Sequence, residues 1–150
     1  AGHPRTNREI ARAMKHEFRF PILSHEVVDG DTVRMVLDVG FKFYHRTSAR
    51  LSGFDAPERY TTAGKLVKQV VEEWMRRRAG AMEFHCIKIA GKYGRPIGTI
   101  YKVGNPADSI GAFLINAGLA KVYESGKRSW GDTELRLIEM KATDLLRGDG

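Results

Sequence analysis

The sequence predicts one domain with a small α+β barrel fold. Three observations lead to this class. A length of 150 residues and a mass of 16.9 kDa suit a single domain. The composition, 42% hydrophobic and 29% charged, is that of a globular chain with an adequate core. Five strand-like segments are interleaved with three helical ones, and the first three strands are contiguous, which disfavours a doubly wound parallel sheet.

The first half of the chain reads as a three-stranded meander between residues 19 and 51. Asp29-Gly30-Asp31 is a strong hairpin signal between two Val-rich runs, and Asp38-Val39-Gly40-Phe41 is the next turn. In the third strand, alternation places one set of side chains on a common face: Tyr44, Arg46, Ser48 and Arg50. Gly53 and Pro57 then break the strand pattern.

The second half alternates helices and strands. A helix is predicted over residues 62–79, closed by Gly80, with an apolar stripe that faces the core. Further elements are expected as a strand over 82–87, a glycine-flanked loop over 89–95, a strand over 97–103, a helix over 110–116 capped by Ser109, a short extended segment over 119–123, and a last helix from 132 or 133 to 146.

Residues 1–17 are expected to form an arm that precedes the domain at 18–150. Thr6-Asn7-Arg8-Glu9 matches a capping box, and a short helix and a frayed tail are equally consistent with it. The chain does not begin with Met, so residues 1–3 can be a cloning remnant. The polar, basic start is not a signal peptide, which favours a cytoplasmic location, with secretion as the alternative if a leader was removed. No apolar stretch reaches the length of a membrane span.

The charge balance points to polyanionic partners. Lysine and arginine number 25 against 18 acids, for a net charge of +7 and an isoelectric point near 9.7. Such an excess is typical of proteins that bind nucleic acid, or less often an anionic membrane, although a basic surface without a function is the competing interpretation. Cys86 is the only cysteine, so a disulfide framework and a cysteine-based zinc site are excluded, and we interpret it as a small buried apolar side chain.

Carboxylates and arginines flank the predicted turns. Asp29, Asp31, Asp55 and Glu58 lie at strand ends, where a rigid scaffold presents functional groups. Each turn taken alone can be purely structural. Arg50 and Arg95 strengthen the functional interpretation, because carboxylates hold a hard divalent cation and guanidinium groups hold phosphate. Together they form a minimal set for phosphoryl chemistry.

Four motifs in this order resemble the staphylococcal nuclease (thermonuclease) family. They are Val28-Asp29-Gly30-Asp31-Thr32-Val33, Arg50-Leu51-Ser52-Gly53-Phe54-Asp55-Ala56-Pro57-Glu58, Lys92-Tyr93-Gly94-Arg95 and Gly118-Leu119-Ala120-Lys121-Val122. The resemblance covers residues 18–146. It implies an OB-like five-stranded β-barrel with three helices, and a calcium-dependent phosphodiesterase that acts on DNA and RNA with little sequence specificity.

The resemblance also implies a single Ca²⁺ ion. It makes Asp31 and Asp55 the carboxylate ligands and places Asp29 near the metal without direct ligation. Ala56 would bind through its backbone carbonyl. The best-known member has threonine at that position, and a carbonyl ligand does not need the hydroxyl.

The remaining roles concern the substrate. Arg50 and Arg95 match the two arginines that grip the scissile phosphate, and Glu58 matches the glutamate that orients or deprotonates the attacking water. Three further positions match substrate contacts of the family: Lys92, Tyr93 and Tyr123. The loop Arg59-Tyr60-Thr61-Thr62 is shorter than the lysine-rich loop of the best-known member, which leaves the substrate preference open.

We expect the protein to be a monomer. Two alternatives to a nuclease stay open. The first is a catalytically inactive nucleic-acid-binding module on the same barrel. Such modules typically lose the carboxylates or the arginines, whereas this chain keeps both. The second is a protein-interaction domain that binds peptides in the barrel groove. That role favours an aromatic cage, and the sequence shows no clear one.

Overall fold

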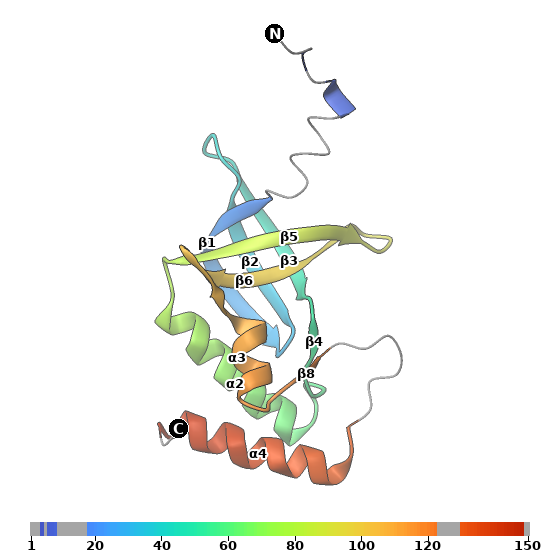
Figure 1. Ribbon diagram of the computed structural model, residues 1–150, viewed down its shortest axis with the longest axis vertical. Helices are drawn as coiled ribbons and strands as arrows, with labels where there is room; N and C mark the ends of the chain where they lie inside the picture. The colour runs from blue at the N-terminus through green and yellow to red at the C-terminus, as the bar shows by residue number, and fades with distance from the viewer. Residues whose placement is uncertain (1–3, 5, 9–17, 123–129, 149–150) are drawn as a thin grey trace.

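The structure, a computed structural model, describes residues 4, 6–8, 18–122 and 130–148. Its first three strands form the predicted antiparallel meander: β1 (Arg19–Asp29), β2 (Thr32–Asp38) and β3 (Tyr44–Leu51) (Figure 1). β1 pairs with β2 through Val27↔Val33, and β2 pairs with β3 through Thr32↔Arg50. The Asp-Gly-Asp segment makes the tight turn between β1 and β2, as its residue types predict.

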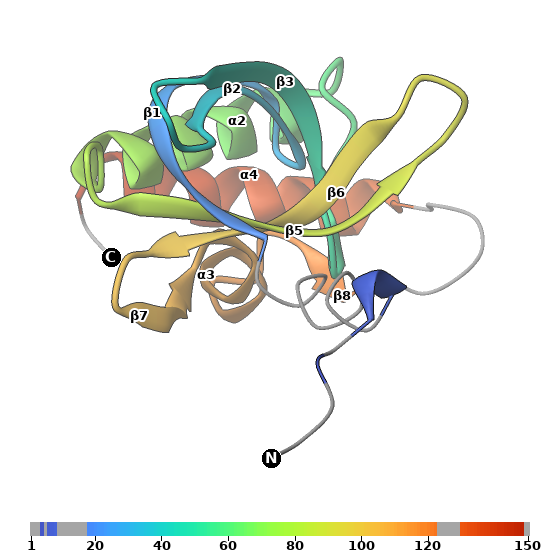
Figure 2. The same ribbon diagram turned by 90° about the horizontal axis from the view of Figure 1, so that it is seen from above.

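A second hairpin closes the sheet into a barrel. β5 (Met82–Ala90) and β6 (Arg95–Lys102) pair with one another, and β5 also pairs with β1. β6 then meets β3 in parallel through Arg50↔Ile97 and Leu51↔Gly98, so the strand order β3-β2-β1-β5-β6 returns to β3. This confirms the OB-like five-stranded barrel (Figure 2).

One glycine lets β6 lie close against β5. A Cβ atom on Gly98 would lie 2.0 Å from the backbone oxygen of His85, so no larger residue fits without moving the strands. The carbonyl of Gly98 accepts a hydrogen bond from the backbone N–H of Ser52 at 2.8 Å. This hydrogen bond and the parallel pairing of β3 with β6 hold the end of β3, which carries Arg50, against β6.

Several strand boundaries differ from the prediction. β5 runs to Ala90 and β6 begins at Arg95, so the expected loop over 89–95 shrinks to a turn over 91–94. The turn is short because Gly91 and Gly94 both adopt positive φ angles. β7 (Asn105–Ser109) and the two-residue pairing of β4 (Phe54–Asp55) with β8 (Lys121–Val122) were not expected, since such short segments carry no readable alternation.

Three helices of the described chain cover one side of the barrel: α2 (Thr62–Arg77), α3 (Ile110–Asn116) and α4 (Asp132–Leu146) (Figure 1). The caps at Thr61 and Ser109 are side-chain hydroxyls that accept from backbone N–H groups three residues on. α2 ends at Arg77, short of the predicted Ala79. Arg78 forms its C-cap and binds Asp108 through two hydrogen bonds of 2.9 Å.

The core lies between the barrel and α2, and α4 packs on α2. The predicted apolar stripe of α2 is buried: Val67, Val70, Val71, Trp74 and Met75. In the N-terminal arm, Asn7 and Arg8 are helical, while the rest of the expected short helix lies outside the described residues. Among the helices that the structure describes, none has the length and apolar character to cross a membrane.

Candidate active site

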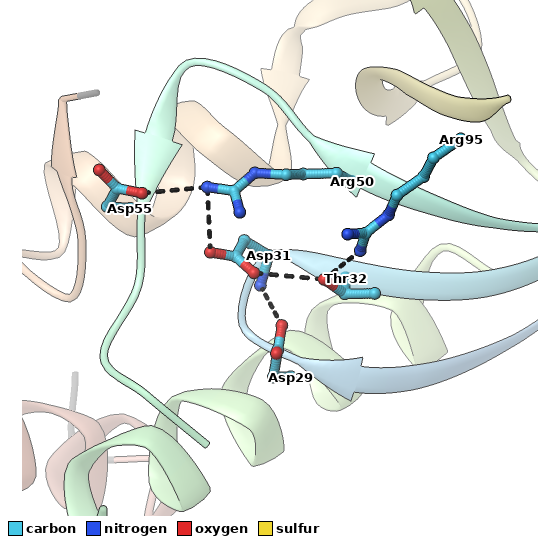
Figure 3. Close-up of polar contacts among 6 residues, drawn as sticks. All are labelled: Asp29, Asp31, Thr32, Arg50, Asp55 and Arg95. Atoms are coloured by element: carbon cyan, nitrogen blue, oxygen red, sulfur yellow. Dashed lines mark hydrogen bonds and ion pairs between the residues drawn. The ribbon is translucent and has the colours of Figure 1, made fainter. Parts of the chain in front are cut away.

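Acidic and arginine side chains gather at the end of the barrel where the β1–β2 turn meets the last residues of β3 and the short strand β4 (Figure 3). Asp29 and Asp31 come from the turn, Arg50 from β3 and Asp55 from β4. Arg95, the first residue of β6, approaches from the neighbouring strand. Segments up to 66 residues apart in the sequence therefore meet at one point.

The β1–β2 turn is held rigidly in place. The backbone N–H of Asp31 donates to Oδ1 of Asp29 at 3.0 Å, and the carbonyl of Asp31 accepts from the N–H of Leu51 at 2.8 Å. A Cβ atom on Gly30 would lie 2.6 Å from the Cβ of Ala56, so glycine lets the turn pack directly on the segment after β4. This contact explains why residues 31 and 55 face the same space.

Arg50 bridges two carboxylates. Its Nη2 atom lies 3.1 Å from Oδ1 of Asp55 and 3.7 Å from Oδ2 of Asp31. The Asp31 side chain is 4% exposed and that of Asp55 is 15% exposed, so both charges are largely withdrawn from water. Two carboxylates that lie against the same guanidinium nitrogen repel one another when both are ionised, and the positive charge of Arg50 offsets that repulsion.

A second arginine reaches the same turn through Thr32. Nη2 of Arg95 donates to Oγ1 of Thr32 at 2.9 Å, and the same hydroxyl donates to Oδ1 of Asp31 at 3.3 Å. Arg50 and Arg95 thus converge on the carboxylate of Asp31 from two adjacent strands (Figure 3). Two planar guanidinium groups in one place can grip a phosphate with paired hydrogen bonds.

The donor set is suited to a hard cation. In the part of the chain that the structure describes, no group of three or more His, Cys, Asp or Glu side chains could hold a metal ion. Two converging carboxylates are present, and Asp31 and Asp55 already attract the positive charge of Arg50. An ion held there would complete its shell with backbone carbonyl and water oxygens, as calcium does readily. The residues therefore fit such an ion.

Glu58 follows Asp55 by three residues, and its backbone is fixed by the start of α2. Its carbonyl accepts from Oγ1 of Thr61 at 2.7 Å. A Cβ atom on Gly64 would lie 1.9 Å from that same carbonyl oxygen, so a glycine in the first turn of the helix lets α2 rest on Glu58. The side chain of Glu58 is half-buried. Its role toward water stays a prediction.

Of the three predicted substrate contacts, two lie in the turn that precedes Arg95 and one lies outside the described residues. Lys92 and Tyr93 occupy the turn between β5 and β6, where Tyr93 is 90% exposed and Nζ of Lys92 lies 5.9 Å from its ring. Tyr123 lies outside the described residues. Cys86 is half-buried, and burial raises the pKa of its thiol, which disfavours the thiolate needed of a nucleophile.

The role of Thr32 in the site was not predicted from the sequence. Its hydroxyl links Arg95 to Asp31, and the residue is nearly buried. One feature of the sequence could have pointed to it: Thr32 follows Asp31 directly, in a strand whose side chains alternate between the inward and outward faces. Its partner lies 63 residues away, so the contact itself could not be read locally.

The fold and the site together define a class: an OB-like barrel that presents a compact acid–arginine cluster fit for phosphate chemistry. The model of the family described as staphylococcal nuclease homologue matches residues 48–148, about two thirds of the chain. The chain belongs to this family, whose members are nucleases and nucleic-acid-binding proteins. The matched range includes Arg50, Asp55 and Arg95 but starts after Asp31. No curated protein matches the chain.

Proposed function

We propose that this protein is a calcium-dependent phosphodiesterase that hydrolyses DNA and RNA with little sequence specificity. The observation that supports this most directly is the convergence of Asp31, Asp55 and Arg50, with Arg95 joined to them through Thr32. A protein that only binds nucleic acid needs positive charge and has no use for two nearly buried carboxylates beside it. Membership of the nuclease homologue family supports the same reaction class.

In this proposal, Asp31, Asp55 and the backbone carbonyl of Ala56 hold the ion, and Asp29 keeps the turn in shape. Ala56 is 1% exposed and packs against Gly30, which keeps its backbone beside the turn. When bound, calcium neutralises charge on the phosphate and acts as a Lewis acid. The preference for calcium rests on a loose, all-oxygen donor set, which magnesium's strict octahedron does not favour.

The arginines act on the phosphate. Arg50 and Arg95 hold its non-bridging oxygens and stabilise the extra negative charge of a five-coordinate phosphorus. Glu58 orients a water molecule and takes its proton as the water attacks in line with the leaving oxygen. The new bond joins the water oxygen to phosphorus. The bond to the leaving oxygen breaks, and that oxygen departs with the electron pair and takes a proton from solvent water.

Substrate recognition follows from charge. Contacts to phosphates position a nucleic acid without reading its sequence, and a net charge of +7 favours any polyanion. We assign the exposed Lys92 and Tyr93 to a neighbouring phosphate and Tyr123 to a base. Affinity should therefore fall steeply with salt and vary little among sequences.

A catalytically inactive nucleic-acid-binding module is the alternative. It predicts binding without cleavage under every metal condition. The acid–arginine cluster favours the enzyme, because a binding module gains nothing from keeping Asp31 and Asp55 nearly buried beside an arginine.

Digestion of plasmid DNA and of a long RNA tests the proposal. Each substrate is incubated with calcium, with magnesium and with excess chelator, alongside an Asp55→Asn variant. A matched control is Arg136→Ala, which removes an exposed charge from α4, a helix that contributes no residue to the cluster. We expect calcium-dependent cleavage that Asp55→Asn lowers and Arg136→Ala leaves unchanged. Full activity in excess chelator would exclude a metal requirement. Binding without cleavage in all three conditions would support the inactive nucleic-acid-binding module.

A further inference from the structure

The outer face of β3 leads away from the active site. Tyr44, Arg46 and Ser48 are exposed and lie on the same face of the strand as Arg50. On the opposite face Ala49 and Leu51 are buried, while Thr47 is half-buried and His45 exposed toward the hairpin tip. Strand register adds β2 residues to this face, because Arg34 is opposite Ser48 and Val36 is opposite Arg46. We call the surface made by Arg34, Arg46, Ser48 and residues 41–44 the β2–β3 track.

The track is hollowed at its centre. A cavity of about 470 Å³ lies over the three strands, and its lining includes Arg34, Arg46, Ser48 and Glu26. Arg34 contacts Glu26 at 3.6 Å, and both side chains are more than 60% exposed. An exposed pair of this kind is weak, so Arg34 can exchange its partner for a phosphate at little cost.

The far end of the track is an aromatic hairpin tip between β2 and β3. Phe41 is 97% exposed, Phe43 69% and Tyr44 62%, with Lys42 among them. A cluster of exposed apolar rings differs from the single exposed residues found on most surfaces, and indicates binding. Hydrogen bonds fix the turn, since the N–H of Phe43 donates to the carbonyl of Gly40 at 2.9 Å.

The length of the track can be estimated from strand geometry. At a rise of about 3.3 Å per residue, Arg46 lies about 13 Å and Tyr44 about 20 Å along β3 from Arg50. At about 3.4 Å per stacked nucleotide, that span corresponds to about six nucleotides. OB-folds bind about 4–16 nucleotides of single strand each. In Figure 1 the hairpin tip projects from the barrel on the side away from α4.

We propose that the β2–β3 track binds single-stranded nucleic acid and guides it to Arg50. Arg34 and Arg46 contact phosphates, and the rings at residues 41–44 stack on bases, which are open to them only in an unpaired strand. The cleavage that follows rests on the proposed function, but the binding does not. An anionic membrane fits this surface less well, because lipid-binding segments gather about 4–8 basic residues and the tip carries Lys42 beside Asp38.

The first test measures binding in chelator, so that cleavage does not interfere. The anisotropy of labelled thymidine oligonucleotides of 12 and 4 nucleotides is followed for wild type, Arg46→Ala and Phe41→Ala/Phe43→Ala. Controls are Arg136→Ala and Met140→Ala, which remove an exposed charge and an exposed apolar side chain from α4.

We expect Arg46→Ala to weaken binding of the 12-mer about fourfold at 0.15 M salt and to lower the salt slope by about 0.7, the effect of one lost phosphate contact. Loss of the two rings should weaken it about 30-fold or more, since each of the two stacked bases contributes about 1–3 kcal/mol. Binding of the 4-mer, which cannot span the track, should change less than twofold, as should all binding by the controls.

Two further measurements separate the outcomes. With calcium, the ring variant should cleave the 4-mer at the wild-type rate and the 12-mer more slowly. If wild type cleaves nothing yet the 12-mer effects appear, the proposed function fails and the track stands. If wild type cleaves both lengths and the variants bind and cleave like wild type, the proposed role of the track is wrong, while the proposed nuclease function is unaffected.

Sedimentation with phosphatidylserine vesicles tests a membrane as the partner of the tip. Loss of vesicle binding in the ring variant, with 12-mer binding intact, would assign the tip to a membrane and overturn the proposal.

Discussion

Replacing Arg50 by lysine separates the catalytic use of this residue from its structural use. Lysine keeps the positive charge between Asp31 and Asp55 but loses the planar fork. A single guanidinium nitrogen spans both carboxylates, at 3.1 and 3.7 Å, and an ammonium can occupy much the same place. Since the charge is kept, we expect the free energy of unfolding to fall by about 1 kcal/mol, the net contribution of the hydrogen bond to Asp55 that lysine can lose. For a domain of this size, that is a shift in Tm of about 2–4 °C.

Turnover should respond very differently. If the guanidinium holds the phosphate as charge develops, its loss should cost about 2.7–4 kcal/mol, which is a factor on the order of 10²–10³ in kcat. Arg95→Lys should fall in the same range, because that side chain approaches the cluster from the other strand. The assay is the initial rate of cleavage of a labelled single strand in saturating calcium, with Arg136→Lys as the control. Near wild-type rates for both Arg50→Lys and Arg95→Lys would refute the phosphate clamp.

Four further substitutions probe the remaining parts of the site. Glu58→Gln removes the acceptor for the proton of water, so kcat should drop by about 10²–10⁴ while calcium affinity, measured by titration calorimetry, stays the same. Asp31→Asn should weaken calcium binding, and rates measured over a calcium series should recover in part at high concentration; a rate loss that no calcium concentration changes would contradict a ligand role. Thr32→Val removes the hydroxyl between Arg95 and Asp31, which should lower kcat about two- to tenfold with KM unchanged, since one net hydrogen bond is worth about 0.5–1.5 kcal/mol; rescue by Thr32→Ser would separate positioning from packing. Gly30→Ala would place a methyl group 2.6 Å from the Cβ of Ala56, so a loss of about 1–3 kcal/mol is expected in urea unfolding, and an unchanged midpoint would contradict the tight contact.

Local chemistry explains why much of the fold could be predicted. The Asp-Gly-Asp turn, the helix caps at Thr61 and Ser109, and the apolar stripe of α2 depend on residues only a few positions apart. Such signals survive in one sequence without knowledge of distant partners. The meander and the three helices followed from them, and counting strands then led to the barrel.

Long-range contacts explain what could not be predicted. Gly98 is required because β6 approaches β5 at His85, and nothing in the residues around it shows this. The short pairing of Asp55 with Lys121 has no periodicity, although it helps to place a carboxylate of the site. The same holds for the hydrogen bond between Arg95 and Thr32. The site residues could be named through family motifs, whereas the contacts among them required the folded chain.

Arg50 can serve both the stability of the site and its proposed function. Without an ion, two nearly buried carboxylates repel one another, and the guanidinium between them removes that repulsion. A calcium ion held by Asp31 and Asp55, as proposed, would take over this task, because its charge is larger and the same two carboxylates would hold it. The guanidinium would then face a cation at close range, an arrangement that becomes favourable only when an anion lies between the two. A phosphate of the substrate is such an anion. One arginine can therefore hold the site together before the ion binds and attract the substrate afterwards, and this explains why it is placed between the two acids and not beside one of them.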